Sequence, residues 1–177
     1  MFFIQCSMNI FVTSYDPTLA AVALDDKRCG KMLVEAAQLF AASLNHHGLD
    51  HHYRISHANH PCAIWARNTC NLEWLIAHAS AMATEFEYRF GKRHKSWYDG
   101  IQPYLDDMSH IKPDDGMTEF SRSCRRTDMG IDYTHIPLIT DGYRLYLTHR
   151  WDLSNPRWTK TPSPWWYFRD NERASTR

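Results

Sequence analysis

Apolar side chains recur every three to four residues over residues 17–45, the spacing of one face of a helix. Asp16 can cap this helix, and Pro17 suits its first position, where a missing N–H costs nothing. Asp26 stands where the apolar stripe expects another hydrophobic residue. We therefore expect one long helix in which the Asp26 carboxylate is either buried with a partner or lines a cavity. The predicted stripe is Leu19, Val22, Ala23, Cys29, Leu33, Ala36, Ala37, Phe40 and Leu44.

A second helical pattern covers residues 61–90. Pro61 marks its start, with His60 or Asn59 at the cap, and Gly91 marks its end. The unpaired backbone N–H groups at such a start attract anions, including phosphate. The predicted stripe is Ile64, Trp65, Leu72, Leu75, Ile76, Ala79, Met82, Ala83, Phe86 and Phe90.

The other segments are less regular. Residues 9–13 form either a short apolar strand or an apolar lead into the first helix, and residues 141–151 carry a third helical pattern. Residues 96–131 combine glycine and proline with poor periodicity, which predicts an irregular insertion with at most short helical turns. The proline-rich, aromatic segment 155–168 is expected to clamp over the helices; the alternative is that its aromatic rings stack on bases.

Length and composition are typical of one globular domain. The 177 residues can bury a real core, 44% of them are hydrophobic, and no apolar run approaches the roughly 20 residues that span a bilayer. We predict a mainly α, small single domain of three principal helices over residues 8–169, with loop-rich connections and an aromatic C-terminal segment. Residues 1–7 are a candidate extension because Met8 could be an alternative start, and residues 170–177 are a frayed tail.

The formal net charge is zero, which argues against simple nonspecific binding of nucleic acid, because phosphate contacts usually need a basic surface. The charges are unevenly distributed, however. Residues 99–119 carry six acids and one lysine, so the rest of the chain has an excess of five positive charges. This pattern fits either a basic face with an acidic loop elsewhere or an ordinary mixed surface.

Cysteine and histidine give no metal signature. The five cysteines form no Cys-x-x-Cys pair, which suits reduced thiols in a cytosol. The pairs His46-His47 and His51-His52 could bind a transition metal, but no acidic or cysteine partner stands at a ligand spacing. We therefore interpret them as part of a solvated loop and predict no metal and no cofactor.

Lys27, Lys31 and Glu35 stand four residues apart on the first predicted helix, with Arg28 adjacent. Like charges at this spacing repel slightly, so helix stability alone does not favour the arrangement. One interpretation is a cationic site coupled to Asp26, in which a desolvated lysine acts as an amine nucleophile or the lysines hold phosphate. The other is a solvated face closed by a Lys31–Glu35 ion pair.

A second group of polar residues surrounds the start of the second predicted helix. Arg67 and Asn71 share a face with Trp74, while Asn68 falls on the apolar stripe and needs a hydrogen-bond partner if it is buried. Trp65 is either a core residue or a platform for a base. The candidate nucleic-acid or phosphate-binding residues are Arg28, His57, His60, Trp65, Arg67, Asn68, Asn71 and Arg144. The residues expected to converge in one cleft between the first two helices are Asp26, Lys27, Lys31, His60, Arg67 and Asn68.

Several short sequence blocks follow one another in a characteristic order along the chain. They are Met8-Asn-Ile-Phe-Val-Thr-Ser14, the Lys27/Lys31 helix, Tyr53-Arg-Ile-Ser-His-Ala-Asn-His-Pro61, Leu72-Glu-Trp-Leu75, Glu85-Phe-Glu-Tyr-Arg-Phe-Gly-Lys92, the Tyr143-Arg144 helix and the tryptophan-rich tail. Together they resemble the bacteriophage pyrimidine-dimer DNA glycosylase (endonuclease V) family. The resemblance covers most of residues 8–168 apart from the middle loop.

This resemblance implies a DNA-repair enzyme that recognises damaged DNA, cleaves the glycosidic bond with an amine through an imine and cuts the strand at the abasic site, its arginines holding phosphates. The family enzyme uses the α-amine of the residue next to the initiator methionine, but methionine removal would not normally expose Phe2 or Asn9. If the chemistry is retained, the amine is a lysine. The candidate catalytic residues are then Lys27 or Lys31 as the amine and Asp26 or Glu35 as the carboxylate.

Two alternatives are a phosphate-binding nucleotide or modified-base enzyme on the same scaffold and a noncatalytic phage nucleic-acid-binding protein. The motifs GxGxxG, GxxxxGK[ST], HExxH and GxSxG are absent, which weakens dinucleotide, nucleotide-hydrolase, zinc-protease and serine-hydrolase interpretations. The expected partner is DNA or a nucleotide, not a membrane, and the expected location is cytoplasmic, within a host cell if the protein is phage-encoded.

Overall fold

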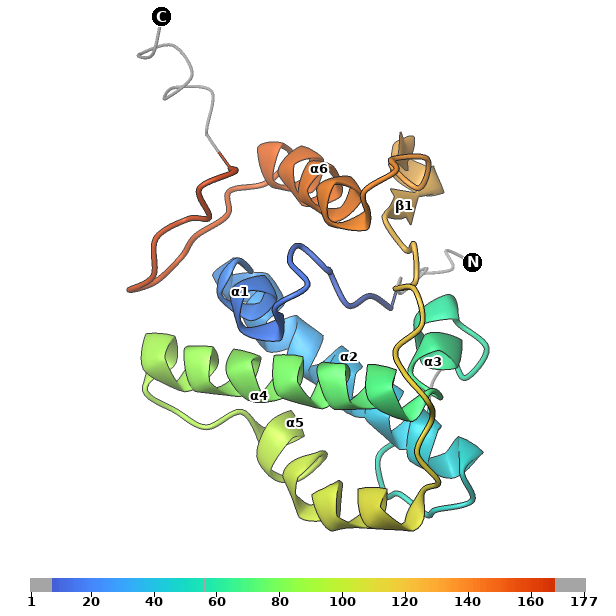
Figure 1. The fold of residues 1–177 in the computed structure, drawn as a ribbon. Coiled ribbons are helices and arrows are strands. Elements are labelled where there is room, and N and C mark those ends of the chain that lie inside the picture. The colour runs from blue at the N-terminus through green and yellow to red at the C-terminus, as the bar shows by residue number, and fades with distance from the viewer. Residues whose placement is uncertain (1–7, 56, 168–177) are drawn as a thin grey trace, which may run out of the picture.

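Helices make up most of the chain in the computed structural model, which describes residues 8–55 and 57–167. Within this part, six α-helices are joined by two 3-10 helices and a small two-stranded sheet (Figure 1). The prediction of a mainly α single domain is confirmed. The candidate extension, residues 1–7, and the predicted tail, residues 170–177, lie outside the described residues.

The first predicted helix is two helices, α1 (Pro17–Val22) and α2 (Asp26–His46), so the expectation of one continuous helix was wrong. The break frees the backbone carbonyls of residues 22–24, and side chains from distant segments bind them. Arg89 donates to the first and the last of these carbonyls, over 3.1 and 2.8 Å, and Trp158 donates to the middle one over 3.1 Å. These bonds satisfy the carbonyls at the break, which would otherwise be costly to bury.

The second predicted helix is also divided, into α3 (Pro61–Trp65) and α4 (Thr69–Phe90). His60 caps α3 through Nδ1, as its position suggested, and Asn68 caps α4 by accepting the backbone N–H three residues later. Because a cap residue has extended backbone angles, Asn68 starts a new helix instead of continuing the old one. Gly91 ends α4 in the left-handed conformation, with φ of 66°.

Residues 96–131 were predicted to be irregular. They contain the end of a four-residue helix, two 3-10 helices and two strands of two residues each. The sheet, which the sequence did not predict, pairs β1 and β2 antiparallel, with Arg125 opposite Asp132. The elements are α5 (Lys95–Tyr98), η1 (Gln102–His110), β1 (Arg125–Arg126), η2 (Thr127–Met129) and β2 (Ile131–Asp132).

The third predicted helix is α6 (Ile139–Asp152), and it covers the N-terminal segment. Residues 8–13 run between α6 and the α1–α2 layer (Figure 1), buried but without strand pairing. The Phe11 ring lies 6.4 Å from the Tyr143 ring and 6.0 Å from the Tyr146 ring, both on α6. Residues 8–13 therefore form a layer between the α1–α2 layer and α6.

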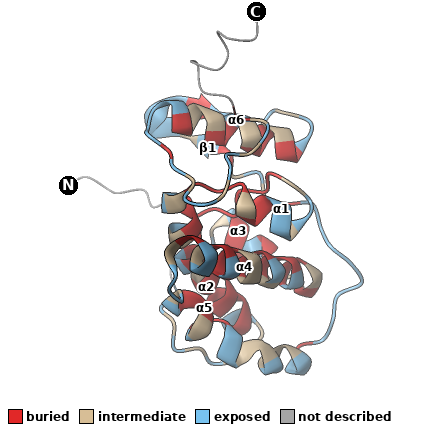
Figure 2. Ribbon diagram, turned by 90° about the vertical axis from the view of Figure 1, so that its left-hand side faces the viewer, coloured by how far each residue is buried: buried red, intermediate tan, exposed pale blue. Residues whose placement is uncertain are grey.

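Buried residues gather where α2, α4 and α5 meet (Figure 2). Two members of the predicted stripes are misplaced, because Leu19 is 59% exposed and Ile64 is 49% exposed. Both lie in the short helices, whose rotation is reset by the breaks that follow them. Among the described residues, none of the helices has the length and hydropathy that a membrane span needs.

Candidate functional site

The carboxylate of Glu35, on α2, binds nitrogen atoms from two different segments. Its Oε2 accepts a hydrogen bond of 2.8 Å from the backbone N–H of Asn9, and its Oε1 lies 3.1 Å from Lys31 Nζ. The Glu35 side chain is only 4% exposed, whereas that of Lys31 is 49% exposed. The predicted Lys31–Glu35 pair is therefore present, but it is not a solvated face, because its carboxylate is buried.

Burial raises the pKa of Glu35 above its ordinary value, although the Lys31 charge and the Asn9 N–H pull the pKa down. Desolvation destabilises the ionised carboxylate more than these two groups stabilise it. A carboxyl group with a raised pKa is a stronger proton acceptor than an ordinary carboxylate. Glu35 thus has the burial and the partners that suit proton transfer.

A first cavity of about 250 Å³ opens beside Lys31. Among its lining residues, Lys27 is exposed and forms no ion pair within the described chain. Arg150 donates to the Tyr146 hydroxyl over 3.2 Å and its charge also acts on Glu35. The cavity is lined by Phe11, Lys27, Arg28, Lys31, Met32, Arg126 and Arg150, so its only charged lining residues are cationic.

A second cavity, of about 480 Å³, is lined by Met8 and shares Arg126 with the first. His60 lines it, and burial, followed by the charge of His57, lowers the pKa of His60. His57 has a positive φ of 57°, a conformation that is strained for a side chain with a Cβ atom. The lining is Met8, His57, His60, Pro61, Arg122, Ser123, Arg125, Arg126, Thr127, Asp128 and Thr134.

Asp26 is held in a structural network and not by the lysines. Its Oδ1 accepts from Arg89 Nη1 over 3.1 Å and from the Thr159 N–H over 2.9 Å, while its Oδ2 accepts from the Thr159 hydroxyl over 2.7 Å. Partial burial alone raises the pKa of Asp26, but the hydrogen bonds from Thr159 and Arg89 outweigh it, and the pKa is lowered. Asp26 lines a cavity together with Lys27, but the contacts of its carboxylate are with Arg89 and Thr159 and not with the lysine column.

Arg89 is the centre of this network. Its side chain is fully buried and also donates to Glu85 Oε1 over 2.7 Å. The Thr161 hydroxyl donates to the same Glu85 oxygen. One arginine thus joins α4, the α1–α2 break and the C-terminal segment.

Arg28 is likewise engaged within the fold. It donates to Asp25 Oδ1 over 2.8 Å, and Trp151 donates to the same oxygen over 2.9 Å. The Arg28 guanidinium also lies 5.9 Å from the centre of the Trp151 ring. Arg28 lines the first cavity, but its charge is already compensated.

The asparagines near α4 attach a loop to the helix. Asn71 is buried; it donates to Trp65 O and to the Thr118 hydroxyl over 2.8 and 2.6 Å and accepts the Thr118 N–H over 3.0 Å. Asn68 donates to Gly116 O over 3.1 Å, so the partner that it was expected to need is a loop carbonyl. Both asparagines have structural partners.

Arg67 and Arg144 also bind backbone. Arg67 donates to Ala58 O over 3.0 Å, and Arg144 donates to Thr13 O over 2.9 Å. The Arg144 guanidinium lies 5.6 Å from the centre of the exposed Trp165 ring. Neither arginine lines the first or the second cavity.

Trp65 is 6% exposed and belongs to an aromatic cluster in the core. Its ring stacks on Phe120 at 5.2 Å and meets Trp74 edge-on at 6.1 Å. A ring enclosed in this way has no free face for a base. Of the two interpretations of Trp65, the structure supports the core residue.

The expected convergence is therefore realised only in part. Lys27 and Lys31 share the first cavity, and His57 and His60 share the second. The candidates that were expected in one cleft are thus divided among separate cavities and structural contacts. Trp65, Arg67, Asn68 and Asn71 make their contacts elsewhere in the fold, whereas Asp26 lines another cavity together with Lys27.

Sequence reasoning missed several residues that border Glu35 or its cavities. The cluster Arg122, Arg125 and Arg126 was visible as a run of charge, but no local pattern linked it to Lys31. Asn9 was missed because its contribution is a backbone nitrogen. The missed residues are Asn9, Arg122, Arg125, Arg126 and Arg150.

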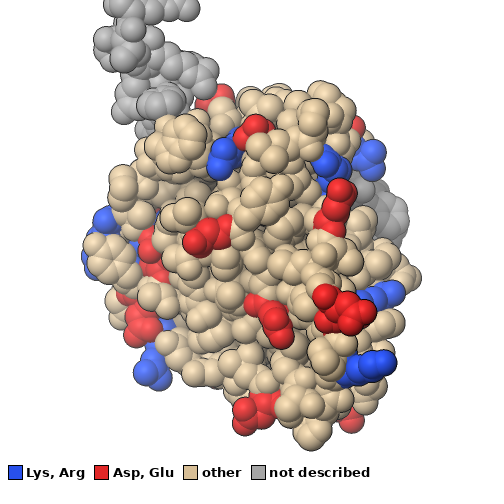
Figure 3. Space-filling model, in the orientation of Figure 1, with Lys and Arg blue, Asp and Glu red and all other residues tan. Residues whose placement is uncertain are grey.

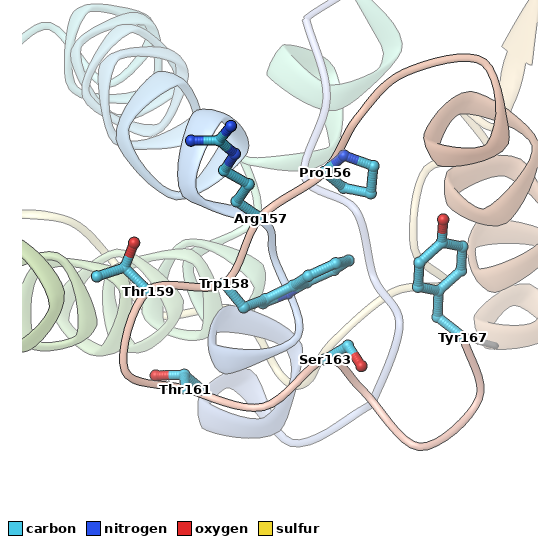
Figure 4. A pocket seen from close by; sticks show the side chains of 7 residues that line it. All are labelled: Pro156, Arg157, Trp158, Thr159, Thr161, Ser163 and Tyr167. Carbon is cyan, nitrogen blue, oxygen red and sulfur yellow. The ribbon is translucent and has the colours of Figure 1, made fainter. Parts of the chain in front are cut away.

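The predicted aromatic clamp is present at the C-terminal end. The Trp158 and Tyr167 rings both lie against Trp151, at 5.0 Å each. A cavity of about 490 Å³ lies along this segment. Figure 4 shows Trp158 projecting toward Tyr167, while Arg157 points to the opposite side of the chain.

Metal ligands are not grouped in the described part of the chain, where no three His, Cys, Asp or Glu side chains are placed to hold an ion. The paired histidines contact aromatic rings and backbone instead. His51 lies 4.1 Å from the Tyr104 ring and bonds to Gly100 O over 2.8 Å. His52 also bonds to the Tyr104 hydroxyl.

Comparison with known proteins finds a family match. A family model described as pyrimidine dimer DNA glycosylase matches residues 8–99, just over half of the chain. The matched segment starts at the residue before Asn9 and includes Glu35, Lys31 and His60. No curated protein and no solved structure matches at a significant level.

Proposed function

Because the chain belongs to the pyrimidine dimer DNA glycosylase family, we propose that it is a DNA-repair glycosylase that acts on pyrimidine dimers, with Glu35 as its active-site carboxylate. The family membership confirms the resemblance seen in the sequence. The observation that carries the proposed site is the Glu35 carboxylate, buried beside a cationic cavity and bound to two nitrogen atoms. An amine nucleophile and a carboxylate are the two groups that this chemistry needs.

The proposed reaction begins when the lone pair of an amine attacks C1′ of the damaged nucleotide. The new C–N bond forms as the glycosidic bond breaks, and the base leaves with the bonding electrons and takes a proton from solvent. The attached nitrogen then loses a proton, its lone pair forms the C=N bond, and the C1′–O4′ bond breaks toward O4′. In this scheme Glu35 accepts the proton from nitrogen and returns a proton to O4′.

Two nitrogen atoms are candidates for the amine. Lys31 Nζ is one, and its contact with Glu35 favours it over Lys27, which lines the cavity without touching the carboxylate. The other is the nitrogen of Asn9, which would be an α-amine in a chain that begins there. An ordinary α-amine, with a pKa of about 8, is more often unprotonated at neutral pH than an ordinary lysine amine, with a pKa of about 10.4.

Borohydride trapping on duplexes with an abasic site or ultraviolet damage tests this proposal. The full chain, a chain starting at Met8 and a chain released by a protease to start at Asn9 would be compared. Each form would also carry Lys31→Ala or Glu35→Gln, with Lys92→Ala, an exposed lysine away from the cavities, as the control. Peptide mass spectrometry of the adduct would identify the reacting nitrogen.

We expect base release and an adduct whose formation Glu35→Gln strongly slows and Lys92→Ala leaves unchanged. An adduct that requires Lys31 in every form would identify the lysine, and an adduct on the Asn9 nitrogen alone would identify the α-amine. Base release without an adduct would retain the glycosylase and reject the imine. Tight nucleotide binding with no reaction on damaged DNA would favour a nucleotide enzyme instead.

A further inference from the structure

We propose that the second half of the chain, which the family match does not include, provides the surface that binds the DNA backbone. The surface is a groove of three connected cavities, named here the arginine groove. The inference rests on the proposed function, because it takes DNA as the ligand. The arginines that residues 100–177 contribute to the groove are Arg122, Arg125, Arg126, Arg150 and Arg157.

The three cavities adjoin one another, because they share lining residues. A third cavity, of about 440 Å³, shares Lys27, Arg28, Arg126 and Arg150 with the first cavity beside Lys31. Arg126 lines all three cavities and joins them at one point. The third cavity extends to Arg157, where the C-terminal segment crosses the start of α2.

Positive charge is concentrated in this groove. Since the whole chain has a formal net charge of zero, the rest of the molecule must carry an excess of acids. The face in Figure 3 shows both signs interspersed. In the groove, eight cationic residues outnumber three acids: Lys27, Arg28, Lys31, Arg122, Arg125, Arg126, Arg150 and Arg157 against Asp25, Asp26 and Asp128.

Each of the three acids is already paired with a particular arginine, so the acids do not neutralise the other cations of the groove. Asp25 and Asp26 are already bound by Arg28 and by Arg89, as described above. Asp128 holds Arg126 through contacts of 3.0 and 3.1 Å. These pairs leave several arginines whose charge is not matched by a contacting carboxylate.

The arginines without a contacting carboxylate are distributed along the groove; one of them, Arg125, stands opposite Asp132 in the sheet, and its charge helps to lower the pKa of that carboxyl group. Arg125 and Arg157 are exposed, and neither side chain forms a hydrogen bond or ion pair within the described chain. Arg122 donates to the carbonyls of Ile136 and Pro137, which do not cancel its charge. Unpaired guanidinium groups of this kind match phosphate oxygens, to which they can donate two parallel hydrogen bonds.

The arrangement fits a polyanion better than a single small anion. A free phosphate would engage the cations of one cavity, whereas the cations line three adjoining cavities. A DNA strand offers successive phosphates that could engage them together. Glu35 lies next to these cavities, because its partner Lys31 lines the first cavity and its other partner, Asn9, follows Met8, which lines the second.

Binding to a fluorescent duplex that contains a tetrahydrofuran abasic-site analogue tests the inference without requiring any reaction. The variant combines Arg125→Ala, Arg150→Ala and Arg157→Ala. The matched control removes the same charge with Lys92→Ala, Lys95→Ala and Lys112→Ala, all of which are exposed. If the triple variant does not fold, the Arg125→Ala/Arg157→Ala pair, from which no described hydrogen bond is lost, replaces it.

Each lost phosphate contact should reduce the slope of log K against log salt by about 0.9, so the triple variant should lose about 2 to 3 in slope. Its affinity at 0.1 M salt should fall on the order of 10²-fold, and the control should change little. Equal affinity of variant and wild type, or weaker binding by the control alone, would overturn the arginine groove. Arginine-dependent binding with no base release by the wild type would retain the groove and reject the glycosylase.

Discussion

Glu35 Oε2 accepts a hydrogen bond of 2.8 Å from the backbone nitrogen of Asn9, which lies 26 residues earlier in the chain. This bond places the N-terminal segment against the buried carboxylate of α2. It also orients the carboxylate, since the other oxygen faces Lys31 at 3.1 Å. The relationship makes Glu35 the first residue to test.

Glu35→Gln should lower the rate of imine formation by on the order of 10²-fold or more, because an amide cannot accept the proton that the reaction releases. The fold should remain, since the glutamine oxygen can still accept the Asn9 N–H. Single-turnover trapping measures the rate. An unchanged rate in a folded Glu35→Gln protein would remove Glu35 from the catalytic scheme.

Glu35→Gln should also change how stability depends on pH. Burial raises the pKa of Glu35 above 4.5, so the wild-type protein loses stability as the pH rises from 4.5 through the raised pKa and the carboxyl ionises. The glutamine variant escapes this loss and should gain stability relative to wild type between pH 4 and pH 8. Thermal unfolding of both proteins at pH 4 and at pH 8 measures this change. If the stability difference between the variant and the wild type were the same at both pH values, the prediction would be contradicted.

His78 should make the protein sensitive to acid. Burial lowers its pKa from 6.5 to about 4, although hydrogen bonds to the Pro17 and Ile10 carbonyls oppose this. The folded state keeps His78 neutral. Its contribution to the free energy of unfolding is therefore fully present above pH 6.5 and is lost as the pH falls toward 4, by about 3 kcal/mol in total. Urea unfolding at pH 7 and pH 4.5 should show a smaller decrease for His78→Gln than for wild type, whereas His110→Gln, at an exposed position, should behave like wild type.

Asp26→Asn should reduce stability and leave the reaction intact. The carboxylate binds Arg89 and Thr159 and does not contact the lysines, so its loss weakens the join between α2 and the C-terminal segment by about 1–3 kcal/mol. Arg89→Ala should cost more, about 3–5 kcal/mol, because it removes the cationic partner of the Glu85 and Asp26 carboxylates and leaves the Val22 and Leu24 carbonyls without their donor. A folded Asp26→Asn protein that forms no adduct would instead restore Asp26 to the catalytic site.

Trp65→Ala should destabilise the protein by about 3–5 kcal/mol through the cavity left beside Phe120 and Trp74. Trp65→Phe fills more of this space and should cost less. Neither change should weaken binding to the abasic duplex once the protein is folded, because the ring is enclosed. Weaker binding by Trp65→Phe with an unchanged melting temperature would favour the base-stacking interpretation.

The periodicity of the sequence predicted where the long helices lie, but it did not predict where the first two predicted helices break. Helical spacing identified α2, α4 and α6, because an apolar stripe is a local property. The break before α2 depends on Arg89 and Trp158, which bind its free carbonyls from 65 and 135 residues away. A pattern read over a few turns contains no information about partners at such distances.

The candidate site divides in the same way. Four-residue spacing alone predicted that Lys31 would meet Glu35, and the arginine cluster at residues 122–126 was visible as charge. The sequence by itself thus determined the helical class, the family and one ion pair. Only the tertiary structure decided that this pair is buried, that Asn9 contacts it and that Arg126 and Arg150 border it, because burial and long-range proximity follow from packing α6 and the N-terminal segment against α2.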